Sequence, residues 1–108
     1  MSENKYPGWY SFIKEKHGDF IKALEQLGEA VRREGPLDNK PAHLVQLAAA
    51  AASRSEGSVH SHTRRALKAG ATPEEIYHAV ILLTSTIGFP HTSAALSWVY
   101  DVLGEEGE

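Results

Sequence analysis

Two serines and a histidine on one face of a predicted helix are the residues best placed to do chemistry in this chain. At about 100° per residue, Ser55, Ser58 and His62 fall within roughly 60° of one another around the helix axis. Histidine exchanges protons near neutral pH because its unperturbed pKa is about 6.5. The pattern predicts that His62 faces the interior or a pocket, with Ser58 one turn before it.

Three interpretations of this group follow from the residues alone. His62 is a core histidine bonded to a backbone carbonyl or to Ser58, or a proton donor or acceptor in a pocket, or the base that activates Ser58. The last role needs an orienting acid and an oxyanion hole, and the sequence around Ser58 has no Gly-x-Ser-x-Gly elbow. A serine hydrolase is therefore the least favoured of the three.

His60 lies about 160° from His62 around the same helix. Two histidines on opposite sides of one helix cannot share a metal ion, so the His-x-His pair alone does not predict a metal site. We interpret His60 as a solvated residue or one that faces another subunit.

The composition excludes several classes of protein. The 108 residues carry 11 Lys and Arg against 14 Asp and Glu, a net charge of −3 with histidine neutral, which offers no basic patch for nucleic acid. Cysteine is absent, which excludes disulfides, thiolate nucleophiles and Cys-ligated metal centres. No signal-peptide pattern and no apolar run near the ~20 residues of a membrane span is present. We expect a cytoplasmic protein with no nucleic-acid or membrane partner.

The elements that position these residues are all predicted to be helices, about six in one compact all-α bundle. Apolar residues recur at helical spacing, and Thr72-Pro73-Glu74-Glu75 forms a capping box with its proline. The alanine run 48–52 indicates that another helix packs closely there. The expected helices cover residues 9–16, 19–33, 39–52, 56–69, 73–87 and a last stretch from Pro90.

Three segments together resemble the carboxymuconolactone decarboxylase superfamily, which includes the alkylhydroperoxidase D-like proteins. They are Gly35 to Ala48, Ser55 to Ile76 and Ile87 to His91, and the block from Ala66 to Ile76 is the most distinctive. The resemblance covers residues 20 to 103. It implies an N-terminal segment with a short helix (1–18), a carboxymuconolactone decarboxylase-like helical domain (19–104) and an acidic tail (105–108). It also implies assembly as a homotrimer or homohexamer.

The resemblance also implies a site. Peroxidase members carry a Glu, a Cys-x-x-Cys pair and a His, and these positions fall on His43, Ser55, Ser58 and His62. A hydroxyl cannot cycle through sulfenic acid and disulfide states, so thiol peroxidase activity is excluded. The decarboxylase branch needs no cysteine pair and implies acid–base chemistry at His62, although no arginine cluster that would bind substrate carboxylates is evident.

We therefore expect a non-redox enzyme or binder of a small carboxylate or lactone-like molecule. His62, Ser58 and His43 are the candidate catalytic residues, Ser55 and His91 the candidate substrate-binding residues, and no cofactor is expected. One alternative is a protein that binds zinc, nickel or copper through His43, His62 and His91. Another is a non-catalytic scaffold that retains only the assembly surface of the fold.

Overall fold

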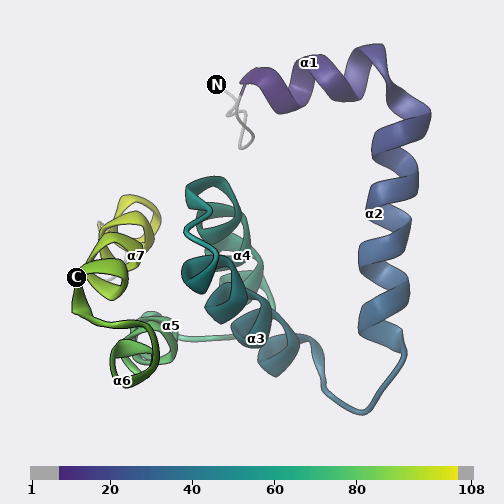
Figure 1. Ribbon diagram of the computed structural model, residues 1–108. Helices are drawn as coiled ribbons and strands as arrows, with labels where there is room; N and C mark the ends of the chain where they lie inside the picture. The colour runs from purple at the N-terminus through teal and green to yellow at the C-terminus, as the bar shows by residue number, and fades with distance from the viewer. Residues whose placement is uncertain (1–7, 105–108) are drawn as a thin grey trace. The chain divides into compact units, whose positions relative to one another are not determined.

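The first unit of the structure consists of two helices. In the computed structural model, which describes residues 8–104, the chain divides after Pro36 into two compact units. The first unit holds α1 (Gly8–Lys16) and α2 (Gly18–Arg33) (Figure 1). The Tyr10 hydroxyl donates to Glu25 Oε2 at 3.2 Å, and Lys14 forms an ion pair with the same oxygen at 3.2 Å. These contacts join α2 to α1 within the first unit.

A row of large apolar side chains is exposed along α2. Phe20, Leu24, Leu27 and Val31 are between 47% and 62% exposed, whereas Ile21 is the buried residue of this helix. The row has the predicted helical spacing. Its exposure leaves α2 with an apolar face that its own unit does not cover.

The second unit, from Leu37 onward, holds the remaining helices and a continuous core. They are α3 (Asn39–Ala52), α4 (Glu56–Lys68), α5 (Pro73–Ile81), α6 (Thr84–Ile87) and α7 (Phe89–Leu103) (Figure 1). Packing of α3 on α4, and of α4 and α5 on α7, buries the core. Its fully buried members are Leu47, Ala51, Val59, Ala66, Ile76, Val80, Ala95, Val99 and Leu103. All regular structure within residues 8–104 is helical, as the sequence predicts.

A tight turn makes α3 and α4 antiparallel neighbours. The N–H groups of Arg54 and Ser55 donate to the carbonyls of Ala51 and Ala50, both at 3.0 Å, which is the Schellman pattern that ends many helices. Arg54 occupies the left-handed position of this motif with φ = 58°. Ser55 then caps α4, so three residues suffice to reverse the chain.

The predicted helix 73–87 is divided into α5 and α6. The Thr72 capping box is present, with Glu75 N–H donating to Thr72 Oγ1 at 3.1 Å and Thr72 N–H donating to Glu75 Oε1 at 3.0 Å. Further along, the Thr84 hydroxyl donates to the Ile81 carbonyl at 2.8 Å, and Leu83 N–H donates to the Val80 carbonyl at 3.0 Å. A side-chain donor at the carbonyl of residue i−3 competes with the regular backbone ladder. The chain therefore turns before α6, and the result is seven helices among the described residues instead of about six.

The acidic tail 105–108 lies outside the described residues. Within residues 8–104, no helix has both the length and the apolar composition that crossing a membrane requires.

Candidate functional site

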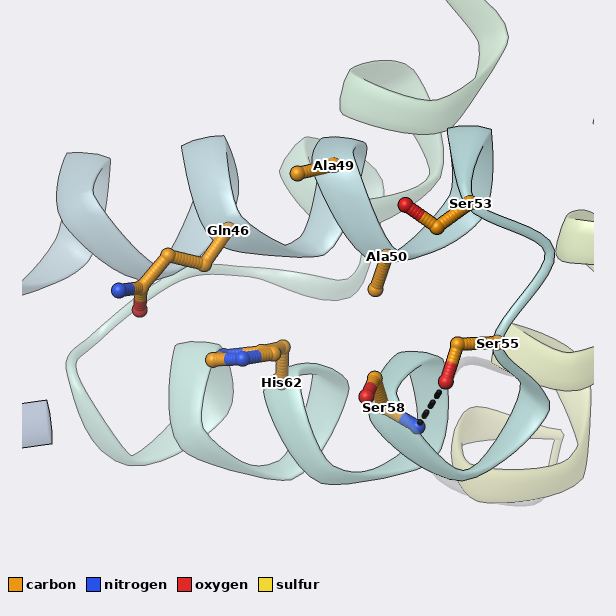
Figure 2. Close-up of a pocket in the computed structure, with 7 residues that line it drawn as sticks. All are labelled: Gln46, Ala49, Ala50, Ser53, Ser55, Ser58 and His62. Atoms are coloured by element: carbon orange, nitrogen blue, oxygen red, sulfur yellow. Dashed lines mark hydrogen bonds between the residues drawn. The ribbon is translucent and has the colours of Figure 1, made fainter. Parts of the chain in front are cut away.

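An open pocket of about 280 Å³ lies between α3 and α4. Figure 2 shows side chains from α3, from α4 and from the turn that joins them facing one another across it. The lining residues are Gln46, Ala49, Ala50, Ser53, Ser55, Ser58 and His62. The pocket belongs entirely to the second unit, and both of its walls are built by the α3–α4 hairpin.

His62 is the one ionisable side chain among the lining residues. It lies one turn after Ser58 on α4, as the helical spacing predicts, and faces the side of α3 that carries Gln46 (Figure 2). The rest of the lining offers hydroxyls, one amide and two alanine methyl groups. Proton exchange with a molecule in this pocket would therefore fall to His62.

His43 lies beside His62 but does not line the pocket. The centroids of the two rings are 5.7 Å apart with an interplanar angle of 40°, and His43 is only 7% exposed. The family resemblance assigns both histidines to one site, and here the two rings lie side by side across α3 and α4. At this separation, His43 is placed to orient His62, and contact of His43 with a ligand would require a change in the pocket.

The two serines differ in what their hydroxyls do. Ser55 Oγ accepts a long hydrogen bond of 3.4 Å from Ser58 N–H, the N-cap interaction that begins α4. Ser58 contributes its own hydroxyl to the pocket wall (Figure 2). Ser55 thus has a structural role in addition to its place in the lining, whereas Ser58 is the nearer hydroxyl to His62 along the helix.

Gln46 and Ser53 line the pocket and are absent from the residues that the sequence analysis selects. They lie three and ten residues after His43, so with Ala50 they continue its face of α3. That spacing is a signal that could have identified them. Within residues 8–104, Gln46 Oε1 is buried and has no hydrogen-bond partner, so it can accept a hydrogen bond from a bound molecule.

His91 does not join the other two predicted histidines. It is exposed near the start of α7 and is not among the residues that line the pocket. Nor do the donor atoms of His43, His62 and His91 form a metal-binding group in the part of the chain that the structure describes. The three-histidine arrangement of the metal-binding alternative is therefore not found among residues 8–104, because the start of α7 does not bring His91 to the α3–α4 hairpin.

His60 contacts a different helix from the one that faces His62. Its Nε2 lies 3.0 Å from Asp101 Oδ2 on α7 and 4.0 Å from Glu56 Oε2 one turn earlier on α4. Helical spacing predicts that His60 lies opposite His62 but does not predict this contact. Forty-one residues separate His60 from Asp101, and no local spacing predicts such a pair.

Comparisons with known proteins identify both the fold and the family of this chain. The crystal structure of apo-lpg0406, a carboxymuconolactone decarboxylase family protein from Legionella pneumophila, matches with a TM-score of 0.76 and 21% identity, over 93% of this chain and 88% of that one. At that identity the likeness shows the fold. The uncharacterized protein MJ1511 of Methanocaldococcus jannaschii is 29% identical over 94 residues, 87% of this chain and 88% of that protein. A model of the carboxymuconolactone decarboxylase family matches residues 18–101, most of the chain, and the protein accordingly belongs to that family.

Proposed function

We propose that this protein binds a small carboxylate or lactone-like molecule in the α3–α4 pocket and exchanges a proton with it through His62. The observation that carries the proposal is the position of His62 as the one ionisable group in a wall of hydroxyls, an amide and methyl groups. A volume of about 280 Å³ lies near the lower end of the ~300–1,000 Å³ typical of ligand pockets. A compact molecule fits this space better than a nucleotide-sized one.

Each polar group has a proposed role. Ser58 donates a hydrogen bond to a carbonyl or carboxylate oxygen of the ligand, and the Gln46 carbonyl accepts one from a ligand hydroxyl. His62 gives or takes the proton, and the buried ring of His43 holds His62 in position. No lysine or arginine lines the pocket, so a ligand carboxylate depends on His62 and on neutral donors. Redox chemistry at a Cys-x-x-Cys pair is excluded, because serines occupy both positions.

The test compares His62→Ala with His78→Ala, a variant of an exposed histidine on α5. Binding of five-membered lactones, with and without a carboxylate, is measured by calorimetry, and turnover by the change in lactone absorbance. We expect His62→Ala to abolish turnover and weaken binding, and His78→Ala to change neither. If His62→Ala left both unchanged, the pocket would not be the site. If no lactone or carboxylate bound to the unaltered protein, the scaffold interpretation would replace this one.

We also propose that the protein self-associates through the exposed row on α2. Phe20, Leu24, Leu27 and Val31 follow the alternating spacing of four and three residues of a two-helix seam. Ala23, Gly28 and Ala30 lie beside this row and would allow a second helix to approach closely. Because one helix carries both the row and its small flanking residues, a second copy of the same helix is a complementary partner, and three such pairs would make the homohexamer expected above.

Light scattering tests the assembly. The double variant Leu24→Glu, Leu27→Glu should lower the measured mass to that of one chain, because two like charges would face each other in every seam. The matched variant Lys22→Glu, Glu29→Lys alters charges of the same helix outside the row and should leave the mass unchanged. A single-chain mass for the unaltered protein would refute the proposal.

A further inference from the structure

A second group of chemically active side chains lies on the face of α4 opposite the pocket. Within residues 8–104, Glu56, His60 and Asp101 form the group of His, Asp and Glu residues whose donor atoms approach closely enough to hold a metal ion. All three donor atoms lie within 4.8 Å of one another. Two come from successive turns of α4 and the third from α7, and these helices pack against each other in one unit.

The group is more than a gathering of surface carboxylates, because an imidazole nitrogen lies at its centre. His60 Nε2 is 3.0 Å from Asp101 Oδ2 and 4.0 Å from Glu56 Oε2. The His60 side chain is only 24% exposed, so packing limits its rotation and directs Nε2 toward the carboxylates. The two acidic side chains are 58% and 53% exposed and can adjust around an ion.

The charges in this group favour a cation. With histidine neutral, the group carries two negative charges. No lysine or arginine in the described part of the chain forms an ion pair with either carboxylate. When the neutral ring carries its hydrogen on Nε2, that hydrogen can bond to one carboxylate, and the second carboxylate then lies beside a like charge without a hydrogen-bond donor from His60. A divalent cation at this point would neutralise both carboxylates and accept the imidazole lone pair.

We infer that Glu56, His60 and Asp101 form a binding site for a divalent transition-metal ion of the zinc type. One imidazole and two carboxylates suit zinc and its neighbours, whereas an all-oxygen set would suit magnesium or calcium. Three protein ligands leave coordination positions open to water on the exposed side. The ion would link the first turns of α4 to the last turns of α7, so its binding should stabilise the second unit. This site is independent of the pocket that carries the proposed function.

The experiment uses the full chain without a histidine tag, dialysed against a chelator and then titrated with Zn²⁺ or with Mg²⁺. We expect saturating Zn²⁺ to raise the Tm by at least about 4 °C, since an ion that binds only the folded state stabilises it. Calorimetry should give one Zn²⁺ per chain. An equal shift with Mg²⁺, or no shift with Zn²⁺, would overturn the inference.

Single-residue variants test which side chains bind the Zn²⁺ ion. His60→Ala and the more conservative Asp101→Asn should each weaken Zn²⁺ binding at least about tenfold, a loss that even outer-sphere changes can cause. Both positions are partly exposed, and circular dichroism checks that the helices remain. His78→Ala serves as the matched control and should bind Zn²⁺ normally. If His62→Ala removed Zn²⁺ binding while His60→Ala retained it, the metal would belong to the pocket and this inference would be wrong.

Discussion

The helices of the second unit pack around a continuous buried apolar core, whereas α2 in the first unit leaves most of its apolar residues exposed. In α7, Ala95, Val99 and Leu103 are fully buried. In α2, four large apolar side chains are about half exposed or more, and Ile21 alone is buried. Both helices have apolar residues at helical spacing. The contrast teaches that periodicity predicts an apolar face but not which partner covers it.

Two helices of the second unit begin with a side-chain cap hydrogen bond, which α2 lacks. In the second unit, Ser55 caps α4 and the Thr72 capping box begins α5. In the first unit, His17 precedes α2 and makes no side-chain cap hydrogen bond. Asp38 and Gly88, which precede α3 and α7, make no such hydrogen bond either, so the main difference between the units is the buried core. The expectations below test this difference.

Replacing one leucine by alanine in each unit should show the difference between the two units most clearly. Leu47→Ala removes a fully buried side chain of the core and should cost about 2–5 kcal/mol of unfolding free energy. Leu27→Ala removes a side chain that is 58% exposed and should cost within about 0.5 kcal/mol in dilute protein, while weakening self-association. Urea denaturation at low and high protein concentration measures both effects. Equal losses in dilute protein would show that the α2 row belongs to the folding core of the single chain.

Most helix boundaries can be predicted from local signals, and the exceptions have identifiable causes. The Gly35-Pro36 break and the Thr72 capping box fix helix ends to within a residue or two, because they act through neighbouring backbone groups. The division between α5 and α6 was missed, because it depends on a Thr84 hydroxyl that competes for a backbone carbonyl. Apolar spacing continues across that point and hides the turn.

The candidate site was predictable along one helix and not between helices. Helical spacing correctly places Ser55, Ser58 and His62 on one face of α4. The family resemblance adds His43, which lies 5.7 Å from His62 between ring centroids. The exposed position of His91 and the contact of His60 with Asp101 depend on how α7 packs on α4. Such contacts between distant segments leave no periodic signal in a single sequence.

Removal of a helix cap should have the next largest effect. Thr72→Ala deletes the oxygen that accepts from Glu75 N–H and should lower the unfolding free energy by about 1 kcal/mol. Thr72→Ser keeps that oxygen and should lose much less. Thermal and urea denaturation of the three proteins provide the measurement. No difference between Ala and Ser would mean that packing on α7, and not the capping box, determines where α5 begins.

The Arg54 position should yield a small gain in stability. Arg54 adopts φ = 58° in the turn between α3 and α4, a conformation that costs a residue with a Cβ about 1–2 kcal/mol. Glycine removes that cost but gains freedom in the unfolded chain, so Arg54→Gly should stabilise the protein by about 0.5 kcal/mol. Arg54→Ala keeps the Cβ and should not stabilise it. A loss of stability in the glycine variant would show that the Arg54 side chain makes a stabilising contact.

The smallest expected effect is a pH dependence that originates at Glu75. The hydrogen bond from Thr72 N–H and the 3.0 Å ion pair with Lys40 hold the pKa of this carboxyl below its ordinary value of 4.5. A depressed folded-state pKa contributes stability above the unfolded-state pKa, and this contribution is lost as the pH falls through the folded-state value. Because both side chains are substantially exposed, solvent and salt should keep the effect small.

Glu75→Gln isolates this charge, since the amide oxygen can still accept from Thr72 N–H. The difference in unfolding free energy between the unaltered protein and Glu75→Gln should be constant near neutral pH and shrink as the pH falls below 4.5. Glu74→Gln, the adjacent exposed carboxyl, is the matched control and should show a smaller change. Because Lys40 lies on α3 and Glu75 on α5, a difference that stayed constant down to pH 3 would mean that this ion pair adds nothing to the stability of the α3–α5 contact.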